Sequence, residues 1–507
     1  MNVAAGNLRG SAVSGGLWSL GQVVANKAFS LLGTLALMYL LVPGDYAISA
    51  LALSIQSFVT FFPAFTLGDA LLARAAEAEA LMGTAVRLCA LISAATVVMV
   101  IAAGPIAAAA YDDQAIAAAC ACVALRPIVE LMLLAPQTRL RLRLEFRRLA
   151  VVDAVTQALA TVSGIAMAWA GAGWLSLLLP QIAFTGVRAL VYRRAAGPAE
   201  PSAAWIAGEW RPLLSAYALS GLGQYVHGGL LMVPPLVIGA FADNEAVGLF
   251  SMAFTLSTAI NVVVAVSIGL VLQPIFARMA EDPNRQLAAF LRSCSTIAAV
   301  AMPFCLVQAV LVGPAIRTFL PSRWEGAIPM AVLLSAGQSF YFAVNPAMSL
   351  LKAQGRFKAF LVWQGLQLMV VAGAMVLAGR LGGERAGLAI VGVAGLYTVI
   401  SAPIGVRLCL RGQPSPWSRS VGLFGRPFLA SLLAVAPAWA GFALLGGVGR
   451  AWDIAHIAVV PLVVACIYPL ALRALDPIAW NEVRHIGSVL VARSRRSGRV
   501  VEGAHRP

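Results

Sequence analysis

The chain has 507 residues, of which 60% are hydrophobic and only 11% are charged, and its mean hydropathy is +0.86. Soluble domains are about 45–50% apolar and about a quarter charged, so this composition excludes a soluble enzyme and a disordered chain. The seven cysteines form no CxxC pair, so neither a zinc site nor a disulfide framework is indicated. The composition predicts an all-α, polytopic membrane protein.

Hydrophobic segments long enough to cross a membrane follow one another along the chain. A helix needs roughly 20 mainly apolar residues to cross about 30 Å of hydrocarbon. Applying that length predicts 14 transmembrane helices, at 17–41, 47–67, 85–110, 115–136, 149–170, 174–192, 212–241, 247–276, 293–312, 328–351, 359–379, 386–408, 427–447 and 454–474.

A short motif recurs in the first and the seventh of these segments. Residues 20–22 read Leu-Gly-Gln, and residues 222–224 repeat these three residues 202 positions later. Six helices return the chain to its starting side, so the repeat predicts two six-helix lobes related by a pseudo-two-fold axis along the membrane normal. The expected parts are an N-terminal lobe at 1–211, a C-terminal lobe at 212–411, an extra helix pair at 412–475 and a basic tail at 476–507.

Lysine and arginine residues concentrate in the connections on one side of the predicted helices. The connections on the opposite side contain only Arg317, Arg323, Arg380, Arg385 and Arg450. The positive-inside rule therefore predicts that the N-terminus and the C-terminus are both cytoplasmic. The same distribution indicates that the basic residues behind the net charge of +15 set the membrane orientation and contact membrane lipids, and do not bind nucleic acid.

The first predicted helix contains a lysine deep in its apolar run. A charge at the bilayer centre costs at least about 2.5–3.5 kcal/mol, so it normally faces a cavity or a partner. Lys27 lies about ten residues into the segment, roughly 15 Å deep at 1.5 Å per residue, and Gln22 and Asn26 share a helix face beside it. The pattern favours a substrate cavity lined by these three side chains, and a structural partner for Lys27 is the alternative.

An arginine and a glutamate lie four residues apart in the fourth predicted helix. Arg126 and Glu130 therefore share one helix face, on which they can form an ion pair. The pair is either structural or a coupling device that opens when an anion competes for the arginine. Intramembrane amides such as Gln157 are expected to hydrogen-bond between helices.

Two further titratable residues lie inside predicted helices. His227 is near the middle of the seventh segment, and its near-neutral titration suits a proton relay, although a hydrogen-bonded structural histidine is the favoured reading. Asp153 lies one turn into the fifth segment, where pairing with Arg147 and Arg148 is favoured over proton transfer. Glu130, His227 and Asp153 are thus the candidates for ion coupling.

A series of short stretches resembles one family of bacterial flippases. These stretches are 14–18 (SGGLW) with Gln22, 41–46 (LVPGDY), 247–253 (VGLFSMA), 274–278 (PIFAR), 322–324 (SRW) with 327–329 (AIP), and 352–358 (KAQGRFK). Their types and order resemble the polysaccharide transporter family, which is grouped with multidrug/toxin extrusion transporters and lipid II flippases in one superfamily.

The resemblance implies two six-helix lobes around a cavity that opens alternately to each side of the bacterial inner membrane. The implied substrate is an undecaprenyl-pyrophosphate-linked oligosaccharide of O-antigen or exopolysaccharide, flipped from the cytoplasmic to the periplasmic leaflet. A gradient of H+ or Na+ is the implied energy source, and a polysaccharide polymerase and a chain-length regulator are the implied protein partners. Lys27 and Arg126 would offset the pyrophosphate charge. No cofactor and no metal ion are expected.

Two other functions stay open at this point. A multidrug/toxin extrusion antiporter for organic cations is the first alternative, although such a pump is expected to place acids in its cavity where this sequence places Lys27. A polysaccharide polymerase or ligase of the same pathway is the second. The sequence has no HExxH, GxSxG or Walker motif, so an enzyme is not predicted.

Overall fold

The structure is a computed structural model that describes residues 29–60, 77–197, 208–258 and 281–485, except 144, 411–416 and 448, together with isolated residues between these ranges. Every regular element in these ranges is helical. The chain divides into two compact units. Unit 1 comprises Met1–Thr255 and Phe360–Val393, and unit 2 comprises Leu256–Ala359 and Ala394–Pro507.

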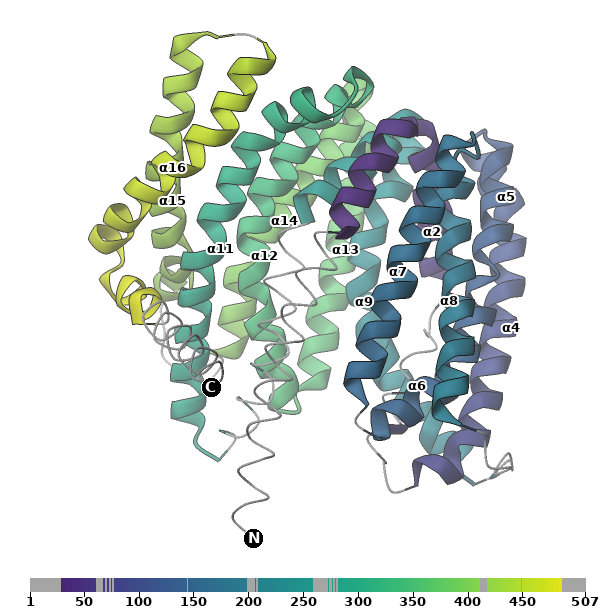
Figure 1. The fold of residues 1–507 in the computed structure, drawn as a ribbon. Coiled ribbons are helices and arrows are strands. Elements are labelled where there is room, and N and C mark those ends of the chain that lie inside the picture. Colours follow the sequence, from purple (N-terminus) through teal and green to yellow (C-terminus); the bar gives the residue numbers. More distant parts are fainter. Residues whose placement is uncertain are drawn as a thin grey trace, which may run out of the picture. The chain divides into compact units, whose positions relative to one another are not determined.

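The helices of each unit follow the chain order (Figure 1). Those of unit 1 are α2 (Pro43–Val59), α4 (Ala78–Ala110), α5 (Gln114–Val123), α6 (Arg126–Leu142), α7 (Phe146–Trp169), α8 (Leu175–Ala196), α9 (Trp210–Phe241) and nearly all of α13 (Phe357–Gly382). Those of unit 2 are α11 (Pro283–Phe319), α12 (Ile328–Ala353), α15 (Trp417–Leu445) and α16 (Arg450–Leu475). Helix α14 (Ala386–Cys409) begins in unit 1 and ends in unit 2.

The predicted fold class is confirmed. Among the described residues, 10 helical segments are long and apolar enough to cross a membrane, and each coincides with one of the predicted segments. The other four predicted segments overlap shorter or partly described helices, at 29–40, in α2, in α9 and at 244–258. The predicted lobe boundaries at 211 and 411 stay predictions.

One membrane span is broken in its middle. Helix α5 ends at Val123 and α6 begins at Arg126, within a single apolar segment, Gln114–Leu142. Pro127 causes the break, because it has no N–H to donate to the carbonyl four residues earlier and its ring clashes with that carbonyl. The Leu125 amide instead donates to the Cys122 carbonyl over 3.2 Å, in a tighter turn. The break is one of hydrogen bonding: Ala124 and Leu125 keep right-handed helical angles, and Arg126 is the first residue after them.

The two segments that follow the first and seventh predicted helices touch each other in unit 1. A Cβ atom on Gly248 would lie 1.9 Å from the carbonyl oxygen of Pro43, at the start of α2, so only glycine fits there. Helix α9 packs along α2, and the Tyr225 hydroxyl donates to the Phe58 carbonyl over 2.9 Å. These contacts join residues about 170–200 positions apart in the sequence.

In unit 2, the hairpin of α15 and α16 packs against α11 (Figure 1). Small and branched residues fill the contact, including Ala434, Val460 and Val464 around Leu306 of α11. At one end of α11, Arg317 forms a bidentate ion pair with Asp453, at 2.8 and 3.2 Å. The hairpin of α15 and α16 is therefore held within unit 2 by both apolar packing and charge.

Candidate functional site

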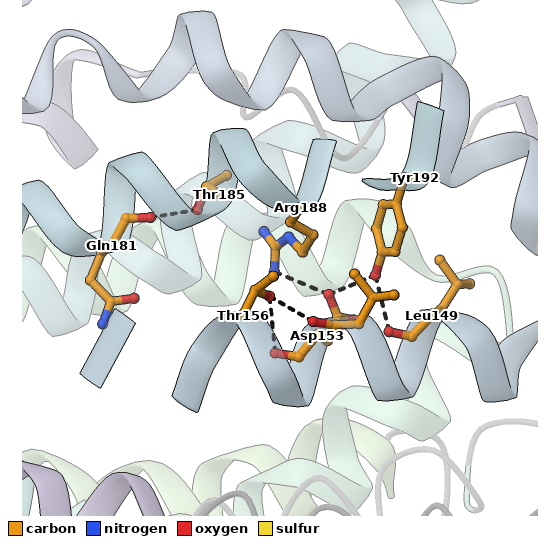
Figure 2. A network of polar contacts seen from close by, with 8 residues as sticks. Leu149, Asp153, Thr156, Gln181, Thr185, Arg188 and Tyr192 are labelled. Atoms are coloured by element: carbon orange, nitrogen blue, oxygen red, sulfur yellow. Dashed lines mark hydrogen bonds and ion pairs between the residues drawn. The ribbon is translucent and has the colours of Figure 1, made fainter. Parts of the chain in front are cut away.

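A polar network joins α7 and α8 inside unit 1 (Figure 2). The Asp153 carboxylate of α7 accepts a hydrogen bond from Arg188 Nη1 at 3.2 Å and another from the Tyr192 hydroxyl at 2.7 Å. The Tyr192 hydroxyl also lies 3.1 Å from the Leu149 carbonyl oxygen. Arg188 and Tyr192 are four residues apart on α8, so one helix face presents both donors to Asp153.

This network corrects the prediction that Asp153 pairs with Arg147 and Arg148. Those arginines precede Asp153 by six and five residues, and only residues three or four apart share a helix face. Arg148 pairs instead with Glu145 at 2.6 Å, and Asp153 pairs with Arg188. The partner of Asp153 therefore lies on a neighbouring helix.

The predicted pair of Arg126 and Glu130 is confirmed. Arg126 Nε lies 2.9 Å from Glu130 Oε1. The pair lies on the first turns of α6, beside the break in the span. The Arg126 side chain is half exposed, so its guanidinium keeps donors that Glu130 does not occupy.

A cavity of about 270 Å³ opens beside this arginine, and we call it the Arg126 cavity. Its polar lining consists of Arg126, Gln157, Gln181, Thr185 and Arg188, and its apolar lining of Leu53, Val123, Leu177, Leu178 and Ile182. Gln181 and Thr185 lie on α8 on the approach to Arg188 (Figure 2). The cavity therefore has two cations and two amides inside a helical bundle.

Several of these lining groups have no partner among the described residues. Arg188 Nε is buried without an acceptor, although Nη1 of the same side chain binds Asp153. The side-chain amides of Gln157 and Gln181 make no hydrogen bond to the described part of the chain, which differs from the helix-bridging role expected of Gln157. The buried Arg188 Nε donor is costly without a partner, so a ligand or water is expected to satisfy it; the Gln157 side chain is partly buried and the Gln181 side chain is exposed.

A second cavity, of about 190 Å³, shares Arg188 with the first, and we call it the Arg141 cavity. It is lined by Gly68, Glu130, Leu133, Leu134, Gln137, Thr138, Arg141 and Arg188. The two cavities together contain the guanidinium groups of three arginines and the carboxylate of Glu130, and Asp153 adjoins them through Arg188. Three positive charges against two negative ones make the region suited to an anion.

The profile of a family described as "Polysaccharide biosynthesis protein" matches residues 36–329, which is more than half of the chain. The chain belongs to this family. The resemblance found in the sequence is thereby confirmed.

Within this polysaccharide biosynthesis family, one relative is the succinoglycan biosynthesis transport protein ExoT of Rhizobium meliloti strain 1021. It is 22% identical over 293 residues, which are 57% of this chain and 58% of that protein. The match thus spans less than two thirds of the relative. Family membership therefore places the chain among polysaccharide biosynthesis proteins, and the name of this relative describes a transport protein.

Two solved structures share the fold. The lipid II flippase MurJ, in an inward closed conformation, has a TM-score of 0.67 and covers 90% of this chain and 98% of its own, at 12% identity. An inward-facing multidrug resistance MATE family transporter of the MOP superfamily has a TM-score of 0.56 and covers 76% and 96%, also at 12% identity. The predicted MATE-like architecture is confirmed.

Some predicted site residues lie outside the described residues. Lys27, Gln22 and Asn26 are among them. The backbone of His227 lies in α9, but its side chain is also outside the described part. Among the residues that the structure describes, no group of three or more acidic, histidine or cysteine side chains could hold a metal ion.

Sequence reasoning missed Arg188 and Arg141 as site residues. Arg188 lies inside the predicted segment 174–192 and received no role there, and Arg141 was expected in a loop, although α6 extends to Leu142. A signal for Arg188 was present, because a cation within an apolar segment needs a partner and Tyr192 follows it at helical spacing. No comparable signal in the sequence predicts that Gln181 and Gln157 line the same cavity, because their proximity depends on how α7 and α8 pack.

Proposed function

We propose that this protein flips an undecaprenyl-pyrophosphate-linked oligosaccharide from the cytoplasmic to the periplasmic leaflet of the bacterial inner membrane. In this proposal both termini are cytoplasmic, and two lobes alternate in access to the two sides. Family membership and the ExoT relative support a polysaccharide intermediate as the substrate. The Arg126 cavity is the observation that supports an anionic lipid-linked substrate most directly.

The physical requirement is to compensate the pyrophosphate inside the bilayer. An unpaired charge there costs several kcal/mol, and arginine offsets a phosphate with planar, paired donors. Arg126 and Arg188 line one cavity, each with donors that its acidic partner does not occupy.

The amides in the same cavity suit the saccharide. Gln157 and Gln181 offer both donors and acceptors on opposite helices, and neither is bonded to the described residues. Sugar hydroxyl groups need such bifunctional partners. An organic cation, the substrate class of the alternative antiporter, gains nothing from two arginines in the cavity, so the lining favours the flippase over that alternative.

Coupling to an H+ or Na+ gradient would act through the acids that hold the arginines. Glu130 and Asp153 each neutralise one arginine of the Arg126 cavity. A pyrophosphate that binds these arginines competes with both carboxylates, which raises their affinity for a cation by the same factor. The binding of the substrate and the binding of the coupling ion are thereby linked. His227 stays a further candidate for proton transfer.

The test measures flipping by the purified full-length protein in proteoliposomes. A fluorescent polyprenyl-pyrophosphate disaccharide is incorporated, and its loss from the outer leaflet is followed by an enzyme that modifies only the accessible sugar. Arg126→Ala is expected to slow flipping roughly ten- to hundredfold, because a hydrogen bond to a charged group contributes about 1.5–3 kcal/mol. Arg126→Lys should restore part of the rate.

The matched control is Arg148→Ala. Arg148 also pairs with a glutamate on its own helix turn, Glu145, but it lines neither cavity. Unchanged flipping by Arg126→Ala, or an equal loss in Arg148→Ala, would contradict the proposal. Flipping that is unaffected while the efflux of a cationic dye changes would favour the antiporter.

A further inference from the structure

Unit 2 contains a separate cavity of about 320 Å³, which lies where three helical segments meet. We call it the Arg426 pocket. It is lined by Arg292 and Ser295 of α11, Ser418 and Arg426 of α15, and Asp476 and Glu482 of the segment after α16, with Leu291, Gly422, Leu423 and Ile478. It shares no residue with the Arg126 and Arg141 cavities.

The segment after α16 closes one side of this pocket. Helix α16 ends at Leu475, and a second helix, 477–485, begins directly afterwards, with the Asp476 carboxylate accepting from the Ala479 amide at 3.0 Å. Ala479 is fully buried against α11 and α15, whereas Ile478 is 73% exposed. The helix thus packs by one face and exposes an apolar side chain on the other, as a helix at a membrane surface does.

Both acids in the pocket are already engaged. Asp476 is 6% exposed and caps helix 477–485, and Glu482 Oε1 lies 3.0 Å from Arg292 Nε. The Arg292 side chain is 70% exposed, so its two terminal nitrogens stay available. The negative charges of the pocket are therefore already used for a helix cap and an ion pair.

The remaining polar groups have no acceptor. Arg426, Ser295 and Ser418 make no hydrogen bond or ion pair within the part of the chain that the structure describes. A guanidinium and two hydroxyl groups that line one concave space are the donor set that a phosphate recognises. Leu291, Leu423 and Ile478 border the same space with apolar surface.

The depth of the pocket identifies the source of that phosphate. The apolar span of α15 begins at Ser420, two residues after Ser418, and the span of α16 ends at Leu475, next to Asp476, while Arg426 lies less than two turns inside the α15 span. The pocket therefore lies at the edge of the hydrocarbon, where phospholipid phosphates are found. Exposed Arg473, three residues before Asp476, adds positive charge at this depth and favours an acidic headgroup.

We propose that the Arg426 pocket binds the headgroup phosphate of an acidic glycerophospholipid, with Arg426 and Arg292 as the phosphate ligands and the leucines along its acyl chains. This proposal is independent of the transported substrate, because all the residues involved belong to unit 2 and none lines the Arg126 cavity.

The test is native mass spectrometry of the full-length protein in detergent, titrated with phosphatidylglycerol, with phosphatidylcholine, or with inorganic phosphate alone. Arg426→Ala is expected to weaken phosphatidylglycerol binding at least about tenfold, since charge-assisted hydrogen bonds to a phosphate are lost. Arg484→Ala is the matched control, because Arg484 is exposed nearby but does not line the pocket, and it should change binding less than about twofold.

A second variant tests whether removing a negative charge from the pocket strengthens lipid binding. Glu482→Gln releases Arg292 and removes a negative charge from the pocket, so it should strengthen phosphatidylglycerol binding. Equal losses in Arg426→Ala and Arg484→Ala, or weaker binding in Glu482→Gln, would overturn the site. Binding of phosphatidylcholine as tight as that of phosphatidylglycerol would overturn the preference for an acidic lipid. Saturable binding of inorganic phosphate that displaces the lipid would overturn the lipid proposal and identify a site for soluble phosphate.

Discussion

Replacing Arg188 with methionine should destabilise unit 1 chiefly by leaving Asp153 without its cation. At the observed 3.2 Å, two unit charges attract by about 5 kcal/mol at an effective dielectric constant of about 20, before their desolvation is subtracted. Exposed pairs yield a net of about 0.2–1 kcal/mol, and breaking a buried pair costs about 3–5 kcal/mol. Because Arg188 and Asp153 are 30% and 40% exposed, we expect a coupling of about 1–2 kcal/mol.

A double-mutant cycle measures this coupling. Arg188→Met, Asp153→Asn and the double variant are purified, and the free energy of unfolding is obtained from SDS titration in mixed micelles, followed by circular dichroism. The double variant should be no less stable than the poorer single variant. The parallel cycle on the exposed pair of Arg148 and Glu145 should give less than about 0.5 kcal/mol. Additive losses within about 0.3–0.5 kcal/mol at Arg188 and Asp153 would refute the reasoning.

Two other contacts lead to predictions of the same kind. Gly248→Ala should destabilise the protein by roughly 1–3 kcal/mol through overpacking and lower its melting temperature. Gly44→Ala is the control, because a Cβ atom there would meet nothing within 4 Å, and it should leave the melting temperature unchanged. Equal effects of the two substitutions would exclude the close contact as the cause. Arg317→Ala leaves the buried Asp453 unpaired, but Arg317 itself is 44% exposed, so the cost should be about 1–3 kcal/mol and hydrogen exchange over 450–475 should accelerate. Arg450→Ala is the control, and unchanged exchange in Arg317→Ala would argue against this ion pair.

The fold class and the span positions could be predicted from the sequence because both depend on apolar length. A run of roughly 20 apolar residues has one stable form in a bilayer, a helix, so ten segments were located without knowledge of packing. The break at Arg126 was not predicted, since proline inside a membrane span is compatible with a continuous helix as well. Only the structure distinguishes the two outcomes.

The candidate site was predictable where both partners lie on one helix. Arg126 and Glu130 are four residues apart, and helix geometry alone brings them together. Asp153 and Arg188 lie on different helices, 35 residues apart, so their contact depends on the packing of α7 against α8. For the same reason the sequence placed Asp153 beside the wrong arginines.

Arg188 lines both cavities of unit 1, so the two spaces draw on a single guanidinium group. An occupant of one that attracts this side chain must lower the affinity of the other for an anion, and thermodynamic reciprocity makes the penalty equal in both directions. The Arg126 cavity and the Arg141 cavity are therefore negatively coupled through the Arg188 side chain: an anion bound in one lowers the affinity of the other.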